Sequence, residues 1–349
     1  MLTPEEKLLI ALCRLDFNEE EKTELRVLVE QVKDWDKIVR ISNEHGIIAL
    51  AAFNLKETHL DCLIPEKQMR MLNDGLIQSM IRNTWLLERW KEVNTILTEA
   101  GIKHVLLKGM ALENTVYGSK GLRQMTDNDI LVKREDGLRA WNLLQNYGFE
   151  PVNIKSFLYK KIITDIGKHL PTLVRDGYAL EIHLKLFNEK EKNSVLDHAV
   201  DNAVGIEIDG TKAFILNNEL HLDYLIEHNN DHLSGSDLEL RLFLDISLLK
   251  NDNYESINDA LLSDPSGLRI HGYRQKIYRQ QFRGLSFPSK LRFIAGDIFP
   301  SVKWMKERYS CGLPGVLIRY PARIGKIMWL IRKSKEPADL SLNSFINRN

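Results

Sequence analysis

The chain has few cysteines and no long apolar run, and these two shortages exclude several classes of protein. Its three cysteines, Cys13, Cys62 and Cys311, include no CxxC pair. An odd number of cysteines without such a pair predicts neither a disulfide framework nor a zinc knuckle. No apolar run approaches the ~18 residues that a membrane-spanning helix needs. The first residues, MLTPEEKLLIALCRL, do not resemble a secretory signal, so we expect a cytoplasmic protein.

The chain also lacks a net charge, but its charges are unevenly distributed. It contains 48 basic and 48 acidic residues. Between Ser266 and Lys335, however, sixteen residues are Lys or Arg and only two, Asp297 and Glu307, are acidic. This asymmetry predicts a basic C-terminal segment that contacts an anionic surface. A basic helical face exposed to solvent explains the same composition equally well, so both interpretations stay open.

Apolar periodicity divides the chain into helical ends and a middle that contains strands. Residues 1–100 show apolar spacings of three and four, which predict a helical N-terminal domain. Residues 101–216 change to short β-rich runs, and residues 217–335 return to helices rich in basic side chains. Residues 336–349 are expected to form a flexible tail. The expected fold class is α+β, with a small mixed β-sheet core flanked by helical N- and C-terminal domains.

The middle region predicts an alternation of strands and helices. The run IKHVLL passes through Lys-Gly directly into a helix, and DNDILV is a second strand. A helix from about Glu135 to Tyr147 follows, and it ends at Gly148. Its expected buried face comprises Leu138, Trp141, Leu144 and Tyr147. The stretch HLPTLVRDGYALEIHLKLF predicts a hairpin around Asp-Gly, and KAFIL predicts a last short strand.

Two aspartates stand at the start of the second strand. Asp127 and Asp129 are two positions apart in QMTDNDILV, and the period of a strand places both on one face. Adjacent carboxylates repel each other and raise each other's pKa unless a cation lies between them. Glu181 falls on the polar face of the later strand YALEIHLKL. If the two strands are neighbours, three carboxylates converge, and such oxygen ligands suit Mg²⁺ or Mn²⁺.

The turn that precedes these acids predicts a phosphate site. A strand that enters a helix through Lys108 and Gly109 presents free backbone N–H groups and the positive end of the helix dipole. Gly109 would let a phosphate approach the backbone, and Lys108 would add positive charge. Arg123, four residues before Asp127, could reach the same phosphates.

The histidines form two groups. The hairpin would direct His169 and His183 toward the acidic face, where either could position an acceptor or act as a general base. A histidine that only satisfies a strand edge is an equally good interpretation of each. On two later helices, a polar interface in which a histidine bonds to an aspartate is the favoured interpretation of His228, His232, Arg241 and Asp245.

In this order, the strand–Lys-Gly–helix turn, the R-x-x-x-D-x-D pattern and the later acid resemble the nucleotidyltransferase superfamily, which has the DNA polymerase β-like fold. More narrowly, the chain resembles an uncharacterised bacterial nucleotidyltransferase family through LLKGMAL, VYGSKGLRQMTDNDILV, NYGF, KHLP and LEIHLKLF. The resemblance covers residues 1 to about 250. It departs from the pattern at Met110, where active relatives usually carry a Gly or a Ser whose hydroxyl contacts the triphosphate.

The resemblance implies a metal-dependent enzyme that transfers a nucleoside monophosphate from an NTP, with ATP expected, to an acceptor hydroxyl and releases pyrophosphate. Asp127, Asp129 and Glu181 would hold Mg²⁺ or Mn²⁺, while Lys108 and Gly109 would hold the triphosphate. The acceptor could be a small molecule, a sugar, an RNA end or a protein. Two alternatives stay open: a non-catalytic nucleotide-binding regulatory protein of the same fold, and a helical interaction protein in which TDND is only a turn.

Overall fold

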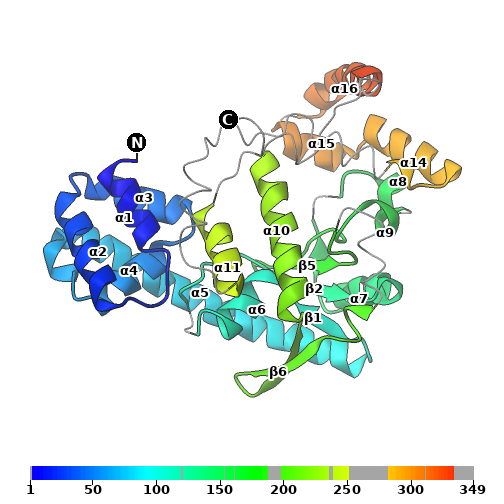
Figure 1. Cartoon of the computed structure of the whole chain (residues 1–349). Coiled ribbons are helices and arrows are strands. Elements are labelled where there is room, and N and C mark those ends of the chain that lie inside the picture. Colours follow the sequence, from blue (N-terminus) through cyan, green and yellow to red (C-terminus); the bar gives the residue numbers. More distant parts are fainter. Residues whose placement is uncertain are drawn as a thin grey trace, which may run out of the picture. The chain divides into compact units, whose positions relative to one another are not determined.

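The computed structural model describes residues 2–118, 121–152, 154–160, 162–187, 198–235, 239–250, 282–310 and 312–333 (Figure 1). The chain divides into two compact units. Unit 1 comprises Met1–Glu150 with Lys168–Arg269, and unit 2 comprises Pro151–Gly167 with Ile270–Asn349. The expected domain boundary at residue 217 therefore falls inside unit 1. The tail expected over residues 336–349 lies outside the described residues.

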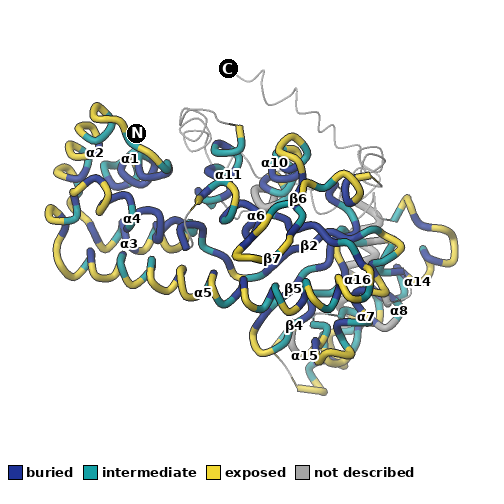
Figure 2. Tube along the Cα trace, turned by 90° about the horizontal axis from the view of Figure 1, so that it is seen from below, coloured by how far each residue is buried: buried dark blue, intermediate teal, exposed yellow. Residues whose placement is uncertain are grey.

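Helices occupy the first hundred residues of unit 1. They are α1 (Pro4–Ala11), α2 (Glu19–Gln31), α3 (Trp35–Glu44), α4 (Ile48–Glu57), a short 3₁₀ turn (Asp61–Leu63) and α5 (Glu66–Glu99). Thr3 and Asn18 begin α1 and α2 with reciprocal capping boxes, which satisfy backbone N–H groups that a helix start leaves unpaired. The exposed and buried faces of α5 alternate along its length, because its apolar residues recur every three or four positions (Figure 2).

Seven strands form one mixed sheet within the described residues. They are β1 (His104–Leu106), β2 (Asn128–Val132), β3 (Glu150–Pro151), β4 (Leu173–Arg175), β5 (Tyr178–His183), β6 (Val204–Ile208) and β7 (Thr211–Ile215). Their order is β3-β4-β5-β2-β1-β7-β6. β2 runs parallel to β5 and antiparallel to β1. The predicted α+β class with a mixed sheet is thus confirmed.

Two hairpins in this sheet turn through Asp-Gly pairs. Asp176 and Gly177 have φ values of 51° and 80°, and Asp209 and Gly210 have φ values of 49° and 73°. Consecutive positive φ values are those of a tight two-residue turn that matches the twist of the flanking strands. The first hairpin joins β4 to β5 as predicted. The second joins β6 to β7, and sequence reasoning identified only its second strand.

Unit 1 contains four further described helices: α6 (Lys108–Thr115), α7 (Arg134–Asn146), α10 (Asn218–Gly235) and α11 (Leu240–Lys250). α11 packs on α10 and joins the core of the N-terminal helices. α6 packs against β2, and α7 packs against β5 and α5. The expected buried face of α7 is half wrong, because Leu138 is 41% exposed and Tyr147 is 49% exposed. Trp141 and Leu144 are buried, together with Gly137 and Ala140. Leu184 packs so closely on Gly137 that a side chain there would collide with it.

The described part of unit 2 is helical and contains a small apolar core. Its helices are α8 (Phe157–Lys160), α9 (Ile163–Ile166), α14 (Phe287–Ile298), α15 (Val302–Tyr309) and α16 (Leu313–Lys333). Tyr159, Ile162, Leu285 and Phe293 form the core. α16 passes through Pro321 without ending there. In neither unit does a described helix combine the length and the apolar character needed to cross a bilayer.

Candidate functional site

The parallel pairing of β2 with β5 brings Asp129 beside Glu181. The two are direct partners in the register of these central strands. Between the two aspartates, Asn128 donates hydrogen bonds from Nδ2 to the carbonyl of Leu86 and to the hydroxyl of Tyr178, both at 3.1 Å. Successive strand residues point to opposite faces. Asn128 therefore anchors β2 to α5, which leaves Asp129 on the face that Glu181 shares.

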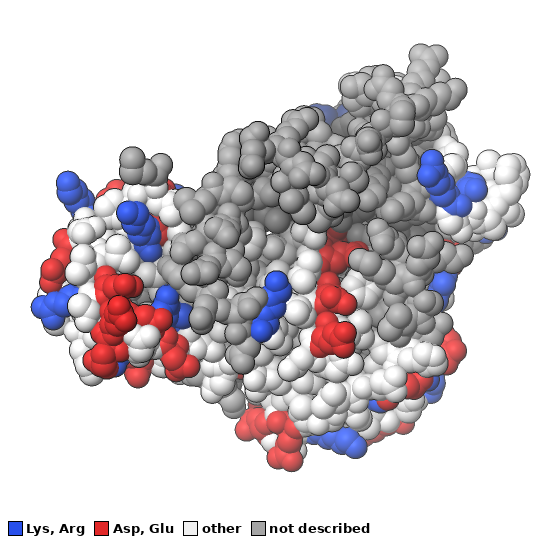
Figure 3. Space-filling view, viewed as in Figure 1, with Lys and Arg blue, Asp and Glu red and all other residues white. Residues whose placement is uncertain are grey.

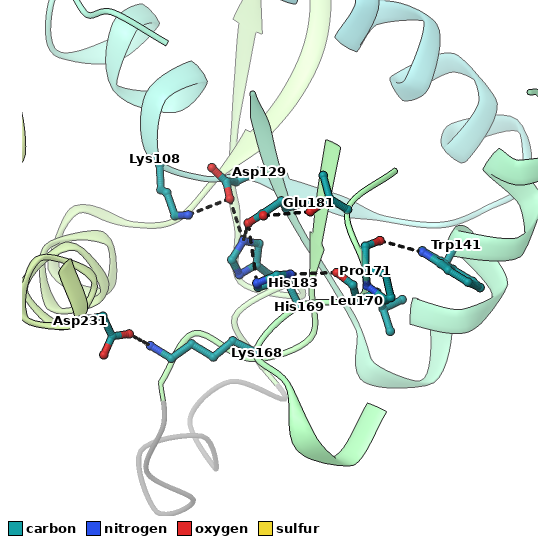
Figure 4. A network of polar contacts seen from close by, with 11 residues as sticks. Lys108, Asp129, Trp141, Lys168, His169, Leu170, Pro171, Glu181, His183 and Asp231 are labelled. Carbon is teal, nitrogen blue, oxygen red and sulfur yellow. Dashed lines mark hydrogen bonds and ion pairs between the residues drawn. The ribbon is translucent and has the colours of Figure 1, made fainter. Parts of the chain in front are cut away.

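His183 completes a cluster with these two acids. One ligand atom each of Asp129, Glu181 and His183 lie within 4.8 Å of one another. Nε2 of His183 donates to Oδ1 of Asp129 at 2.8 Å and lies 3.6 Å from Oε2 of Glu181. Figure 4 shows the imidazole between the two carboxylates. Two carboxylates and one imidazole can together bind a divalent metal ion, so the donor set fits such an ion.

Lys108 supplies a positive charge to this cluster. Its Nζ lies 2.8 Å from Oδ1 of Asp129, the same oxygen that His183 contacts (Figure 4). Burial alone would raise the pKa of Asp129, but Lys108 and His183 outweigh burial and hold that pKa well below its usual range. Burial alone would lower the pKa of Lys108, but Asp129, with Tyr224 and Glu181, outweighs burial and raises it. Both groups of the pair are therefore charged.

The backbone of Lys108 adopts an uncommon conformation. Lys108 is the first residue of α6, and its φ is 45°, in the left-handed region that side chains other than glycine rarely occupy. Such a conformation costs about 1–3 kcal/mol and persists where surrounding structure enforces it, often at functional sites. In this conformation the ammonium group of Lys108 points toward Asp129.

Asp127 lies near the cluster but outside its group of three ligand atoms. Asp127 directly precedes β2, and Thr126 donates a hydrogen bond to the carboxylate of Asp127 at 3.2 Å. Burial and the nearby charge of Asp129 raise the pKa of Asp127, and Lys108 only partly opposes this. The expected ligand set was Asp127, Asp129 and Glu181. The structure brings together Asp129 and Glu181, with His183 in the third position.

His169 and Thr172 flank Glu181 on the side away from Lys108. Nδ1 of His169 donates to the carbonyl of Leu170 at 2.8 Å, and its Nε2 lies 4.0 Å from Oε2 of Glu181. Thr172 donates to the other carboxylate oxygen of Glu181 at 3.1 Å. Burial lowers the pKa of His169, although Glu181 acts in the opposite direction. The Nε2 atom of His169 therefore carries a lone pair at the edge of the site.

Arg123 has an environment different from the expected one. Its guanidinium is buried and donates from Nε and Nη2 to the carboxylate of Asp245 at 2.9 and 2.6 Å. Tyr117 donates to Asp245 at 2.8 Å. Asp245 thus bonds to Arg123 and Tyr117, in place of the histidine partner that the sequence suggested. The side chain of His232 lies outside the described residues.

Gly109 also serves the packing of Arg123. A Cβ atom on Gly109 would lie 2.5 Å from Nη1 of Arg123 and 2.7 Å from Sδ of Met125. These separations are shorter than any that real Cβ atoms adopt, so a larger residue would force the buried guanidinium to move. The space beside Gly109, where we expected a phosphate, is occupied by these two side chains.

Tyr224 is a site residue that sequence reasoning missed. It lies on α10 and is 1% exposed, and its ring meets that of His183 edge-on at 6.2 Å between centroids. Its hydroxyl interacts with the ammonium of Lys108, which acts to lower the pKa of Tyr224, although burial outweighs this effect and raises that pKa. Tyr224 therefore borders the cluster through both Lys108 and His183. In the sequence, Tyr224 is indistinguishable from an aromatic core residue of an amphipathic helix.

An acidic face of α10 borders the site. Glu219, Asp223, Glu227 and Asp231 recur every four residues and so share one face of the helix. Figure 3 shows a column of acidic side chains beside the position of α10 in Figure 1. Lys168 pairs with Glu227 at 3.2 Å and with Asp231 at 2.6 Å. Glu219 and Asp223 line a cavity of about 580 Å³. Lys168 therefore offsets part of the negative charge of this face.

Comparison with known proteins identifies the family of the chain. The model of a family described as uncharacterised nucleotidyltransferase matches residues 31–266. The chain belongs to this family. The match spans α3 through the whole sheet and α11, so it includes the Asp129, Glu181 and His183 cluster of this nucleotidyltransferase domain. The resemblance noted in the sequence is confirmed. A search of the curated proteins found no match.

Proposed function

We propose that the protein transfers a nucleoside monophosphate from an NTP to an acceptor hydroxyl in a divalent-metal-dependent reaction. The observation that carries the proposal is the Asp129, Glu181 and His183 cluster beside Lys108, within a chain of the nucleotidyltransferase family. In the reaction, the acceptor oxygen bonds to the α-phosphorus and the bond from that phosphorus to the bridging oxygen breaks. Pyrophosphate leaves with the electron pair of the broken bond.

Asp129, Glu181 and His183 would hold the metal ion, Mg²⁺ or Mn²⁺. Bound there, the ion neutralises negative charge that develops on the phosphoryl group and on the leaving pyrophosphate. Asp127, whose pKa is raised because Lys108 only partly opposes burial and the charge of Asp129, would complete the negative surface toward the same ion. The pairing of β2 with β5 keeps Asp129 and Glu181 on one rigid surface, which orients the bound nucleotide.

His169 would accept the proton of the acceptor hydroxyl. Its Nδ1 hydrogen is committed to the carbonyl of Leu170, so the lone pair of Nε2 is available. Its side chain is 42% exposed, which allows an acceptor to reach it. A general base must lie within hydrogen-bond reach of the proton that it removes. His169 meets that requirement for an acceptor bound on the Glu181 side of the cluster.

Lys108 would contact the triphosphate, with ATP the expected donor. Its ammonium is the cation nearest the carboxylates and lies at the start of α6. A charge-assisted contact from lysine to phosphate is stronger than a contact from a neutral hydroxyl. Met110, the residue after Gly109, has no hydroxyl, and its side chain is only 2% exposed and packs in the core.

A second candidate function is regulatory nucleotide binding without transfer. The ion pair of Lys108 with Asp129 favours it, because this contact neutralises the acid without a metal. Met110 favours it also, because the resemblance implies a Gly or a Ser at this position in active relatives. In this case the protein would bind Mg²⁺–NTP and release no pyrophosphate.

The basic C-terminal segment is proposed to contact an anionic surface. On α14 and α15, exposed Arg292, Lys303 and Lys306 alternate with exposed Leu291 and Val302. Basic and apolar side chains on one segment suit a negatively charged membrane surface or polymer. Co-sedimentation with anionic vesicles, compared with neutral vesicles and at rising salt, tests this contact.

The transfer reaction is tested with labelled nucleotides. The purified protein is incubated with Mg²⁺ or Mn²⁺ and each α-³²P-labelled NTP, with and without cell extract. We expect α-label in an acceptor together with release of pyrophosphate. Asp129→Asn should lose both, while Glu207→Gln on the edge strand β6 should behave as wild type. Metal-dependent NTP binding without pyrophosphate release in any extract would instead establish the regulatory function.

A further inference from the structure

The third member of the cluster is a nitrogen donor. Sequence reasoning expected three carboxylates, but Asp127 lies outside the group and His183 lies within it. We infer that Asp129, Glu181 and His183 form a mixed nitrogen–oxygen site that binds Mn²⁺ in preference to Mg²⁺. The inference rests on the proposed function only in supposing that this ion serves nucleotide transfer.

The chemistry of the donor set supports this preference. Mg²⁺ is a small, hard ion that takes oxygen ligands and keeps several waters. Imidazole nitrogen favours transition metals, and the affinity of a given site rises along the series that begins with Mn²⁺. Mn²⁺ also accepts carboxylates and phosphate oxygens in octahedral coordination. Among divalent ions it therefore suits both this cluster and a nucleotide.

The ring of His183 is placed to serve as a ligand through Nε2. The residue is 3% exposed and held in β5, so the ring cannot turn out to solvent. Nε2 faces both carboxylates, while Nδ1 is buried and has no hydrogen-bond partner among the described residues. In the structure Nε2 donates to Asp129, and for this atom to bind a metal ion the ring hydrogen would move to Nδ1, a position for which no described residue competes.

The structure also contains a cation, Lys108, that neutralises the carboxylate of Asp129 as a bound metal ion would. Lys108 and His183 both use Oδ1 of Asp129. Lys108 is 14% exposed and its stem reaches in from α6, so the ammonium can withdraw toward solvent or phosphate. His183 and Glu181 belong to one strand and cannot withdraw. An ion that enters the cluster therefore replaces Lys108 and keeps the nitrogen ligand.

Metal binding without nucleotide tests the inference directly. The full-length, metal-free protein is titrated with Mn²⁺ and separately with Mg²⁺ by calorimetry. We expect the dissociation constant for Mn²⁺ to be lower by about tenfold or more, because an imidazole ligand favours a transition-metal ion over Mg²⁺. Pulsed EPR of the Mn²⁺-loaded wild type should show modulation from a directly bound ¹⁴N nucleus. This spectrum needs no variant, so a folding defect cannot obscure it.

Two variants identify the nitrogen. His183→Asn replaces the imidazole with an oxygen donor, and we expect the ¹⁴N modulation to vanish and the preference for Mn²⁺ to shrink toward unity. His169→Asn, the matched control, removes the neighbouring imidazole that lies outside the cluster and should retain the ¹⁴N signal. Equal affinities for Mn²⁺ and Mg²⁺, or a Mn²⁺ spectrum without ¹⁴N modulation, would overturn the inference. If nucleotide transfer occurs but the Mn²⁺ spectrum shows no ¹⁴N modulation, the proposed function holds and the metal inference is wrong. If Mn²⁺ is nitrogen-ligated but no transfer occurs, the metal inference holds and the proposed function is wrong.

Discussion

Lys108 is ion-paired with Asp129, at 2.8 Å between Nζ and Oδ1, from a backbone position with a φ of 45°. Both side chains are largely buried, at 14% and 6% exposure. A buried carboxylate that keeps its charge needs a compensating cation. Lys108 therefore performs, in the absence of metal, the neutralisation that a bound metal ion would perform.

Lys108→Met should change metal binding and nucleotide binding in opposite directions. Without the ammonium group, the charge of Asp129 is uncompensated and no cation competes for its Oδ1, so Mn²⁺ should bind more tightly by about tenfold, or about 1.4 kcal/mol. ATP should bind more weakly, and AMP should be affected less, because the lysine is proposed to contact the phosphates beyond the first. Calorimetric titrations with Mn²⁺, ATP and AMP measure all three. Lys103→Met, which changes a half-buried lysine that contacts Asp201 and Phe214 and not the cluster, is the control. Weaker Mn²⁺ binding in Lys108→Met would contradict the ion-pair competition.

Asp129→Asn and Asp127→Asn should differ sharply in stability. Replacing Asp129 leaves the ammonium of Lys108 buried without its partner, and breaking a buried pair in this way costs about 3–5 kcal/mol. Replacing Asp127 removes a carboxylate that raises the electrostatic energy of the cluster, so stability should stay within about 1 kcal/mol of wild type or rise. Urea unfolding of the metal-free proteins gives both free energies. Equal losses for the two variants would mean that Lys108 does not depend on Asp129.

Local sequence patterns predicted β2 and β5, and they predicted which face of each strand carries Asp129 and Glu181. The alternation in DNDILV and YALEIH places Asp129 and Glu181 on the polar faces of their strands, and the sheet then aligns them as partners. The strand β6 was missed because Val204 is 45% exposed and the strand lies at the sheet edge, where apolar alternation is weak. Its Asp209-Gly210 turn was a usable signal, since the same dipeptide identified the first hairpin.

Contacts between distant segments could not be predicted. Arg123 and Asp245 are 122 residues apart and are brought together by the packing of α11. The sequence shows only an arginine near an acidic motif, and its partner depends on tertiary structure. The same holds for Tyr224, whose position beside His183 follows from how α10 crosses the sheet. Spacing identifies residues that share a strand, but it does not identify the helix that covers them.

Asp245→Asn should destabilise the protein and leave nucleotide affinity unchanged. Asp245 is fully buried and is the partner of Arg123, so its loss leaves a buried guanidinium unpaired, at a cost of about 3–5 kcal/mol. Chemical unfolding measures the stability, and ATP titration at a low temperature, where the variant is folded, measures the affinity. Arg123→Lys should behave similarly because lysine cannot make the paired contact. A folded Arg123→Lys variant with wild-type stability and lost ATP affinity would show that Arg123 contacts phosphate after all.

Glu113 connects α6 to the segment that leads into Asp127. It is 3% exposed, and its carboxylate accepts hydrogen bonds from the backbone N–H groups of Gly121 and Arg123. Burial raises the pKa of Glu113 from 4.5 to about 7, although these N–H groups oppose the change. The folded protein therefore binds a proton at Glu113 more tightly than the unfolded chain does.

The contribution of Glu113 to stability should consequently fall as pH rises from 5 to 8. An acid whose pKa is raised by folding stabilises the native state fully below its unfolded pKa, and this contribution is lost as pH rises through the folded pKa of about 7. The loss is at most about 3 kcal/mol, because one pKa unit corresponds to about 1.4 kcal/mol. Glu113→Gln, which cannot ionise, should lack this contribution, so the unfolding free energy of the wild type should fall relative to that of the variant over the same window. Glu207→Gln, at an exposed strand position, should keep the wild-type slope. A Glu113→Gln profile parallel to that of the wild type would mean that Glu113 does not titrate between these pH values.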